Sequence, residues 1–79
     1  MQNLDKKLKK FSAKERTENE HLVEKILDRQ FTGLDCKKLK GLKNIFRIRK
    51  GKIRIIFELK NNLEPFILTI ERRKENTYK

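Results

Sequence analysis

The sequence is poor in several residue types, and each shortage excludes a class of protein. Cys36 is the single cysteine, so the chain can form neither an internal disulfide nor a cysteine-rich metal cluster. No apolar run reaches the ~18 residues that cross a bilayer, and the first residues show no apolar h-region of the secretory type. We therefore expect a cytoplasmic protein with no membrane partner.

Acidic residues are also scarce relative to basic ones. Lys and Arg number 22 against 11 Asp and Glu, which gives a net charge of +11 in 79 residues. An excess of this size favours a polyanionic partner, with nucleic acid ahead of an acidic protein or a membrane surface. A chain of this length has room for one small core, so residues 1–79 are predicted to form a single domain.

The first half of the chain has helical periodicity. Apolar residues recur there at spacings of four and three, at Leu4, Leu8 and Phe11. Ser12 and Glu15 then have the spacing of a capping box, which predicts the start of a second helix. That helix is predicted to end near Arg29.

From Asn44 onward the apolar period changes to two, which is typical of half-buried strands. Lys50-Gly51 separates two alternating runs and predicts a tight hairpin turn. A third strand is predicted from Phe66 to Arg73, with Pro65 just before it. The predicted fold is α+β, with two N-terminal helices packed on one face of a three-stranded antiparallel sheet.

The predicted turn also sets a register for the hairpin. With residues 50–51 as the turn, Arg47 lies opposite Arg54, and Arg49 lies opposite Lys52. One sheet face is then apolar and the other basic. Like charges placed opposite one another destabilise a sheet by about 0.2–1 kcal/mol per pair, and a bound anion would relieve the repulsion. Solvated cations are common on open sheet faces, so a purely structural role also stays open.

These residues carry a resemblance. "KKLKGLKNIFRIRKGKIRIIFELKNN", followed by a last strand and "ERRKENTYK", resembles the RelE/ParE superfamily of toxins, particularly its RelE-like mRNA endonucleases. The shared pattern is a Lys-Leu-x-Gly lead-in, a strand of the form aromatic-basic-Ile-basic, a Gly turn, an Arg before an apolar run, and a final Arg before a Tyr. The resemblance covers residues 3–79. Family members open with a short strand, which this chain is expected to lack.

The resemblance implies the toxin of a toxin-antitoxin system, an enzyme that cleaves mRNA on the ribosome without a metal ion or cofactor. Its partners would be mRNA, ribosomal RNA and a cognate antitoxin. The catalytic positions that it implies are Arg47, Arg49, Arg54, Arg73 and Tyr78. Lys50, Lys52 and Arg72 are expected to bind RNA, and Arg72 is an alternative to Arg73. The arginines would hold the phosphate, and Tyr78 is the candidate general base.

Two other functions stay open. ParE-type members share the fold and inhibit DNA gyrase, and an inactive, truncated relative would bind nucleic acid without cutting it. The combination of basic positions with a tyrosine favours the nuclease. Among the remaining polar residues, His21 is predicted to be solvated and Glu58 to offset the charge of Arg54. Glu71 occupies a position, just before the final arginine, at which many family members carry a small residue or a histidine.

Overall fold

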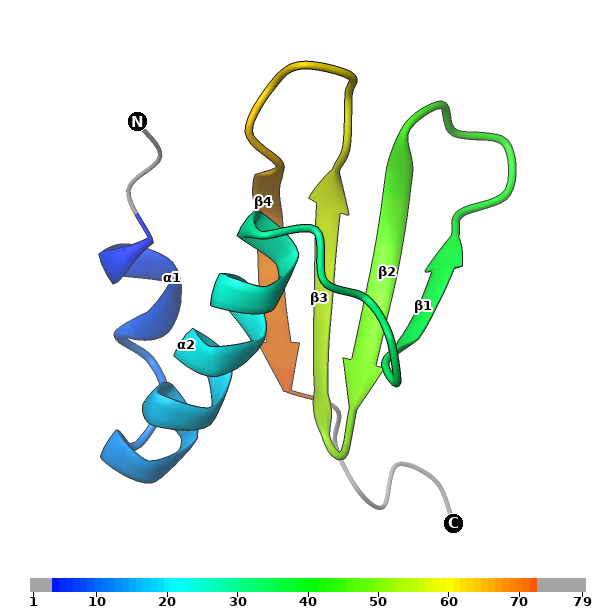
Figure 1. Ribbon diagram of the computed structural model, residues 1–79. Helices are drawn as coiled ribbons and strands as arrows, with labels where there is room; N and C mark the ends of the chain where they lie inside the picture. The colour runs from blue at the N-terminus through cyan, green and yellow to red at the C-terminus, as the bar shows by residue number, and fades with distance from the viewer. Residues whose placement is uncertain (1–3, 73–79) are drawn as a thin grey trace, which may run out of the picture.

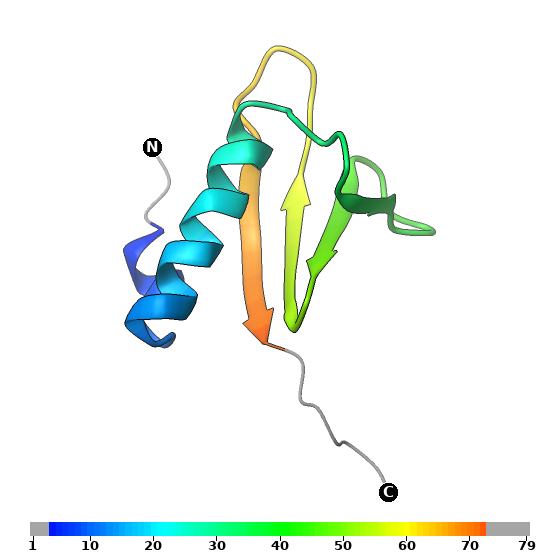
Figure 2. The same ribbon diagram turned by 60° about the horizontal axis from the view of Figure 1, so that its bottom comes forward.

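The computed structural model describes residues 4–72, and Figure 1 shows their arrangement. Within this range there are two helices and four strands: α1 (Asp5–Leu8), α2 (Ala13–Leu27), β1 (Asp35–Lys38), β2 (Ile45–Lys50), β3 (Ile53–Glu58) and β4 (Phe66–Arg72). Both helices lie on the same side of the sheet (Figure 2). The α+β class is therefore confirmed.

The sheet has one strand more than predicted. Its order is β1-β2-β3-β4, and each strand is antiparallel to its neighbour. The predicted count of three strands is wrong because β1 has the sequence DCKK, whose side chains show no apolar alternation. This segment becomes a strand by pairing with β2, where Cys36 lies opposite Ile48.

The second helix starts as the sequence predicts. Ser12 Oγ accepts a hydrogen bond from the Glu15 backbone N–H at 3.2 Å, and Glu15 Oε1 accepts one from the Ser12 N–H at 3.5 Å. This reciprocal pairing is the expected capping box. The expected loss of a leading strand concerns residues 1–3, which lie outside the described residues. No helix among residues 4–72 is long and apolar enough to cross a membrane.

The core lies between α2 and the inner face of the sheet, which we define as the face toward the helices. Its fully enclosed aliphatic and aromatic side chains are Ile26, Ile48, Ile55, Phe57, Ile67 and Ile70. The ring of Phe57 stacks on Phe31 and on Phe46, with centroid distances of 5.8 and 5.9 Å. The opposite face, called the outer face below, carries no helix of the described part (Figures 1 and 2).

The β2–β3 turn lies one residue later than predicted. Arg49 pairs with Arg54, and Arg47 lies opposite Ile56, so the turn consists of Gly51 and Lys52. The predicted pairs, Arg47 with Arg54 and Arg49 with Lys52, are wrong. Gly51 has a φ of +59°, which suits glycine at the first position of a two-residue turn. Moving the turn by one residue moves each pairing by two, so the residues of the two strands keep their predicted faces. Lys52, predicted on the basic face opposite Arg49, lies instead in the turn.

Candidate nucleic-acid interface

Four charged residues form one row across the outer face. The register pairs Asp35 with Arg49, Arg49 with Arg54, and Arg54 with Glu71, one residue from each strand. Arg49 Nη2 lies 3.3 Å from Asp35 Oδ2. The two opposed arginines are therefore flanked by an acid at each end. The sequence did not show the Asp35 contact, because it depends on the unpredicted strand β1.

A second row, next to the first, holds buried polar atoms without partners. It runs from Lys37 through Arg47 and Ile56 to Thr69. Within the described residues, Arg47 Nε and Thr69 Oγ1 of this row, and Arg54 Nε of the first row, are enclosed and make no hydrogen bond. Leaving such a group unpaired costs about 1–3 kcal/mol. Residues with unpaired polar groups thus lie on three adjacent strands of the outer face. An anion with several oxygens would pair with these groups once the side chains turn outward.

Thr69 was missed by sequence reasoning. It follows a β-bulge: Ile56 pairs with Thr69 and Phe57 with Ile67, which leaves Leu68 as an extra residue of β4. The bulge changes the alternation of β4, so Thr69 cannot be assigned to the outer face from spacing alone. Glu58 also differs from its predicted role of offsetting Arg54, because its ion pair is with Lys60, at 3.5 Å.

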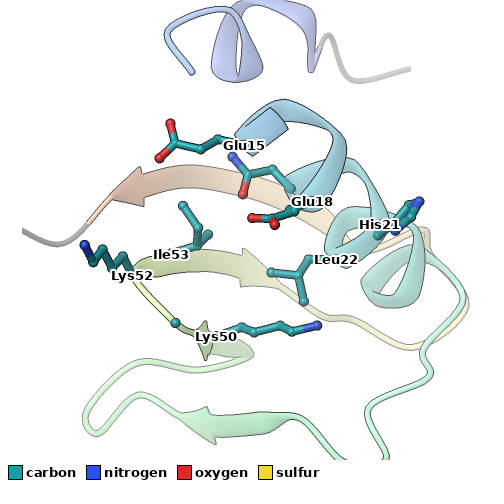
Figure 3. A pocket seen from close by; sticks show the side chains of 9 residues that line it. Glu15, Glu18, His21, Leu22, Lys50, Lys52 and Ile53 are labelled. Atoms are coloured by element: carbon teal, nitrogen blue, oxygen red, sulfur yellow. The ribbon is translucent and has the colours of Figure 1, made fainter. Parts of the chain in front are cut away.

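A cleft of about 430 Å³ lies on the helix side, between α2 and the tip of the β2–β3 hairpin (Figure 3). It is lined by residues 50–53 of the hairpin and by Glu15, Glu18, Asn19, His21 and Leu22 of α2. We call it the α2 cleft. The His21 side chain is exposed, as predicted.

The α2 cleft contains a buried amide. Asn19 has no exposed surface, and within the described residues neither its Nδ2 nor its Oδ1 makes a hydrogen bond. Leu22 and Ile53, which also line the cleft, are almost completely buried, so the surroundings of the amide are largely apolar. An unpaired amide in such a place is costly unless a ligand completes it.

The expected site residues fall into two groups. Arg47, Arg49 and Arg54 share the outer face, as predicted. Lys50 and Lys52 line the α2 cleft, and Arg72 Nη1 lies 3.3 Å from Glu15 Oε2, a residue that also lines it. In Figure 3 the two lysine side chains point in different directions from the turn. The expected RNA-binding residues therefore lie on the helix side of the hairpin tip, away from the three arginines.

Two expected catalytic residues, Arg73 and Tyr78, lie outside the described residues. Residues 4–72 contain no group of three or more His, Cys, Asp and Glu placed to hold a metal ion.

Burial raises the pKa of the Cys36 thiol, and the nearby Asp35 carboxylate raises it further. Cys36 therefore stays protonated near neutral pH and is a poor nucleophile.

No protein-family model matches the chain, and no curated protein matches it. The structure is similar to a chain in the crystal structure of the RelB-RelE antitoxin-toxin complex from Methanococcus jannaschii. The TM-score is 0.69 and the sequence identity 26%, over 85% of this chain and 80% of that chain. This similarity supports a fold of the kind found in that complex.

Proposed function

We propose that the protein is the toxin of a toxin-antitoxin system, a RelE-like endoribonuclease that cleaves mRNA on the ribosome and so inhibits translation. Similarity to a component of an antitoxin-toxin complex supports the broader role in such a system. The net charge of +11 and the "FRIRKGKIR" segment support the toxin rather than its antitoxin.

The observation that carries the nuclease proposal is the set of unpaired groups on the outer face. Arg47 Nε, Arg54 Nε and Thr69 Oγ1 lie on three adjacent strands, among the described residues, without hydrogen-bond partners. An arginine that donates from Nε and one Nη binds two oxygens of a phosphate side-on. Two such arginines beside a hydroxyl group suit a phosphodiester better than a single carboxylate.

The chemistry follows from these donors. Internal RNA cleavage removes the proton of a 2′-hydroxyl, builds negative charge on the attacked phosphate and protonates the departing 5′-oxygen. Fixed guanidinium groups stabilise the developing charge because they need no reorganisation during the reaction. We assign this role to Arg47 and Arg54, and Arg49, fixed by Asp35, adds positive charge beside them. Thr69 would donate to a phosphate oxygen.

Arginine is a poor proton acceptor, so the general base must come from elsewhere. Tyr78 stays the candidate base, and Arg73 the candidate further cation, from the family pattern. The expected RNA contacts of Lys50, Lys52 and Arg72 would involve nucleotides on the helix side of the hairpin. Exposed lysines in and after β1, including Lys37 and Lys40, suit contacts with ribosomal RNA.

One observation favours the ParE-type role, inhibition of DNA gyrase, as a second candidate. The Arg49–Arg54 pair has Asp35 and Glu71 as its cross-strand neighbours. Carboxylates at both ends lower the local positive potential and would weaken phosphate binding. The same row would instead suit a protein surface of mixed charge.

The deciding experiment combines the protein with ribosomes programmed with a defined mRNA and maps the cut ends, beside a gyrase supercoiling assay. We expect cleavage by the wild type and a loss of about a hundredfold or more in Arg54→Ala. Arg16→Ala, which removes the same charge from an exposed position on α2, is the matched control and should cleave normally. Inhibition of supercoiling without mRNA cleavage would contradict the nuclease proposal and support the ParE-type role. Absence of both activities would favour the inactive, nucleic-acid-binding relative.

A further inference from the structure

The position of Asn19 in α2 is unusual for the residue that occupies it. The buried stripe of this helix otherwise consists of Leu22, Val23 and Ile26. An aliphatic residue at position 19 would complete the stripe without burying an unpaired polar group. The side chain is instead a primary amide with no exposed surface and, within the described residues, with both polar atoms unpaired. A buried group without partners calls for an explanation, and a binding partner that supplies the missing hydrogen bonds provides one.

The surroundings of the amide limit what that partner can be. The cleft has aliphatic walls at Leu22 and Ile53, a carboxylate at Glu18 and an ammonium group at Lys50. Its volume of about 430 Å³ falls in the range of pockets that hold small organic ligands. A planar ring would pack on the aliphatic walls, an anionic group would bind the lysine, and a hydrogen-bonding edge would face the amide.

A primary amide offers a donor and an acceptor side by side, and it pairs with a base edge that has both, as asparagine does with adenine. The Glu18 carboxylate accepts from an exocyclic amine, which adenine, cytosine and guanine carry and uracil lacks. We propose that the α2 cleft binds one nucleotide of a single-stranded RNA, with an amine-bearing base against Asn19 and Glu18 and its phosphate on Lys50. This site rests on the proposed function insofar as RNA is the partner.

The hairpin connects this cleft to the outer face. Arg49 directly precedes Lys50, and Arg54 directly follows Ile53, so neighbouring residues of the same two strands point to opposite sides of the sheet. An RNA strand that passes over the hairpin tip meets the arginine row on one side and the α2 cleft on the other. The cleft would therefore read a base near the phosphate that the arginines hold, which gives the reaction a base preference.

The site can be tested on the isolated protein by NMR, without ribosomes. We expect AMP, CMP or GMP to shift the side-chain amide resonances of Asn19 and to bind about tenfold more tightly than UMP. Asn19→Leu should weaken AMP binding by about tenfold while keeping the fold, because leucine continues the apolar stripe. Lys50→Ala, a change at an exposed position, gives an independent second variant.

Arg54→Ala is the control that separates this inference from the proposed function. Its side chain lies on the outer face, so it should lose cleavage and still bind AMP in the cleft. If ribosomal mRNA is not cleaved but AMP binding depends on Asn19, the nuclease proposal fails and the nucleotide site stands. Equal shifts from AMP, UMP and inorganic phosphate would overturn the site, and so would unchanged AMP binding in both Asn19→Leu and Lys50→Ala.

Discussion

Arg49 of β2 lies directly opposite Arg54 of β3, with Asp35 and Glu71 as the next residues in the same row. Like charges at such positions repel, and the acids at both ends offset that repulsion. The ion pair of Arg49 with Asp35, at 3.3 Å, also fixes one of the two guanidinium groups. The repulsion between the two arginines is therefore partly offset in the free protein.

Removing the carboxylate that pairs with Arg49 should lower the stability slightly and raise the affinity for RNA. The paired side chains of Arg49 and Asp35 are 38% and 39% exposed, so we expect Asp35→Asn to cost only about 0.2–1 kcal/mol, and less at high salt. Affinity for a short RNA should rise because the row gains net positive charge. Urea unfolding at two salt concentrations and fluorescence anisotropy measure the two effects.

Asp28→Asn is the matched control for that change, since Asp28 is exposed at the end of α2 and the net charge changes equally. If both variants raised RNA affinity to the same degree, the charged row would have no special part in binding.

The capping box makes a separable contribution to stability. Ser12→Ala removes the acceptor of the Glu15 N–H bond and should cost about 0.5–2 kcal/mol. Thr17→Ala removes a hydroxyl that bonds back to the Ala13 carbonyl at 3.1 Å inside the same helix, where the contribution is close to neutral. Urea unfolding of both variants checks the difference, and equal losses would contradict a specific role of the cap.

The ring of Phe57 is completely buried and stacks on the rings of Phe31 and Phe46. We expect Phe57→Ala to cost about 3–5 kcal/mol, against a total stability of roughly 4–12 kcal/mol for 79 residues. Thermal unfolding followed by circular dichroism should show a much lower midpoint. Phe66→Ala is the matched control, because that ring is 47% exposed and its removal should change the midpoint little. A similar loss in both variants would contradict the central place of Phe57 in the core.

The sequence was informative where structure is local. The capping box at Ser12 and the period of two in β2 and β3 are read directly, and they placed Arg47, Arg49 and Arg54 on one face. The strand β1 was missed because its polar residues become a strand only by pairing with β2. The register was missed because glycine can occupy either position of a two-residue turn, and here Gly51 takes the first.

The parts of the candidate site that spacing did not show depend on tertiary structure. Thr69 reaches the outer face only after the bulge at Leu68. Asn19 looks like an ordinary polar residue of a polar helix, and only the packing of α2 on the sheet makes it buried. In both cases the signal is an unpaired buried atom, a property that exists only once the chain is folded.

The Cys36 thiol should titrate above its ordinary range. Because its pKa is raised in the folded protein, the stability linked to this proton is complete below the pKa of the unfolded chain and is lost as pH rises through the folded value. Alkylation rates with iodoacetamide, measured from about pH 7 to about pH 10 beside a cysteine peptide, should show a higher midpoint for the protein. Asp35→Asn should lower this midpoint only in part, because burial, the larger cause of the raised pKa, remains. An unchanged midpoint in Asp35→Asn would contradict the contribution of the Asp35 carboxylate.

The unpaired amide of Asn19 should make the free protein less stable than it would be with an apolar residue. Asn19→Leu removes two buried polar atoms that lack partners among the described residues and extends the stripe of Leu22, Val23 and Ile26, so we expect a gain of about 1–3 kcal/mol. Urea unfolding without ligand measures this gain, and Asn19→Ala, which leaves a cavity, is the comparison and should gain less.

A loss of stability in Asn19→Leu would mean that the amide is already paired in the free protein. A gain together with weaker AMP binding would mean that stability is given up at this position for recognition of a ligand.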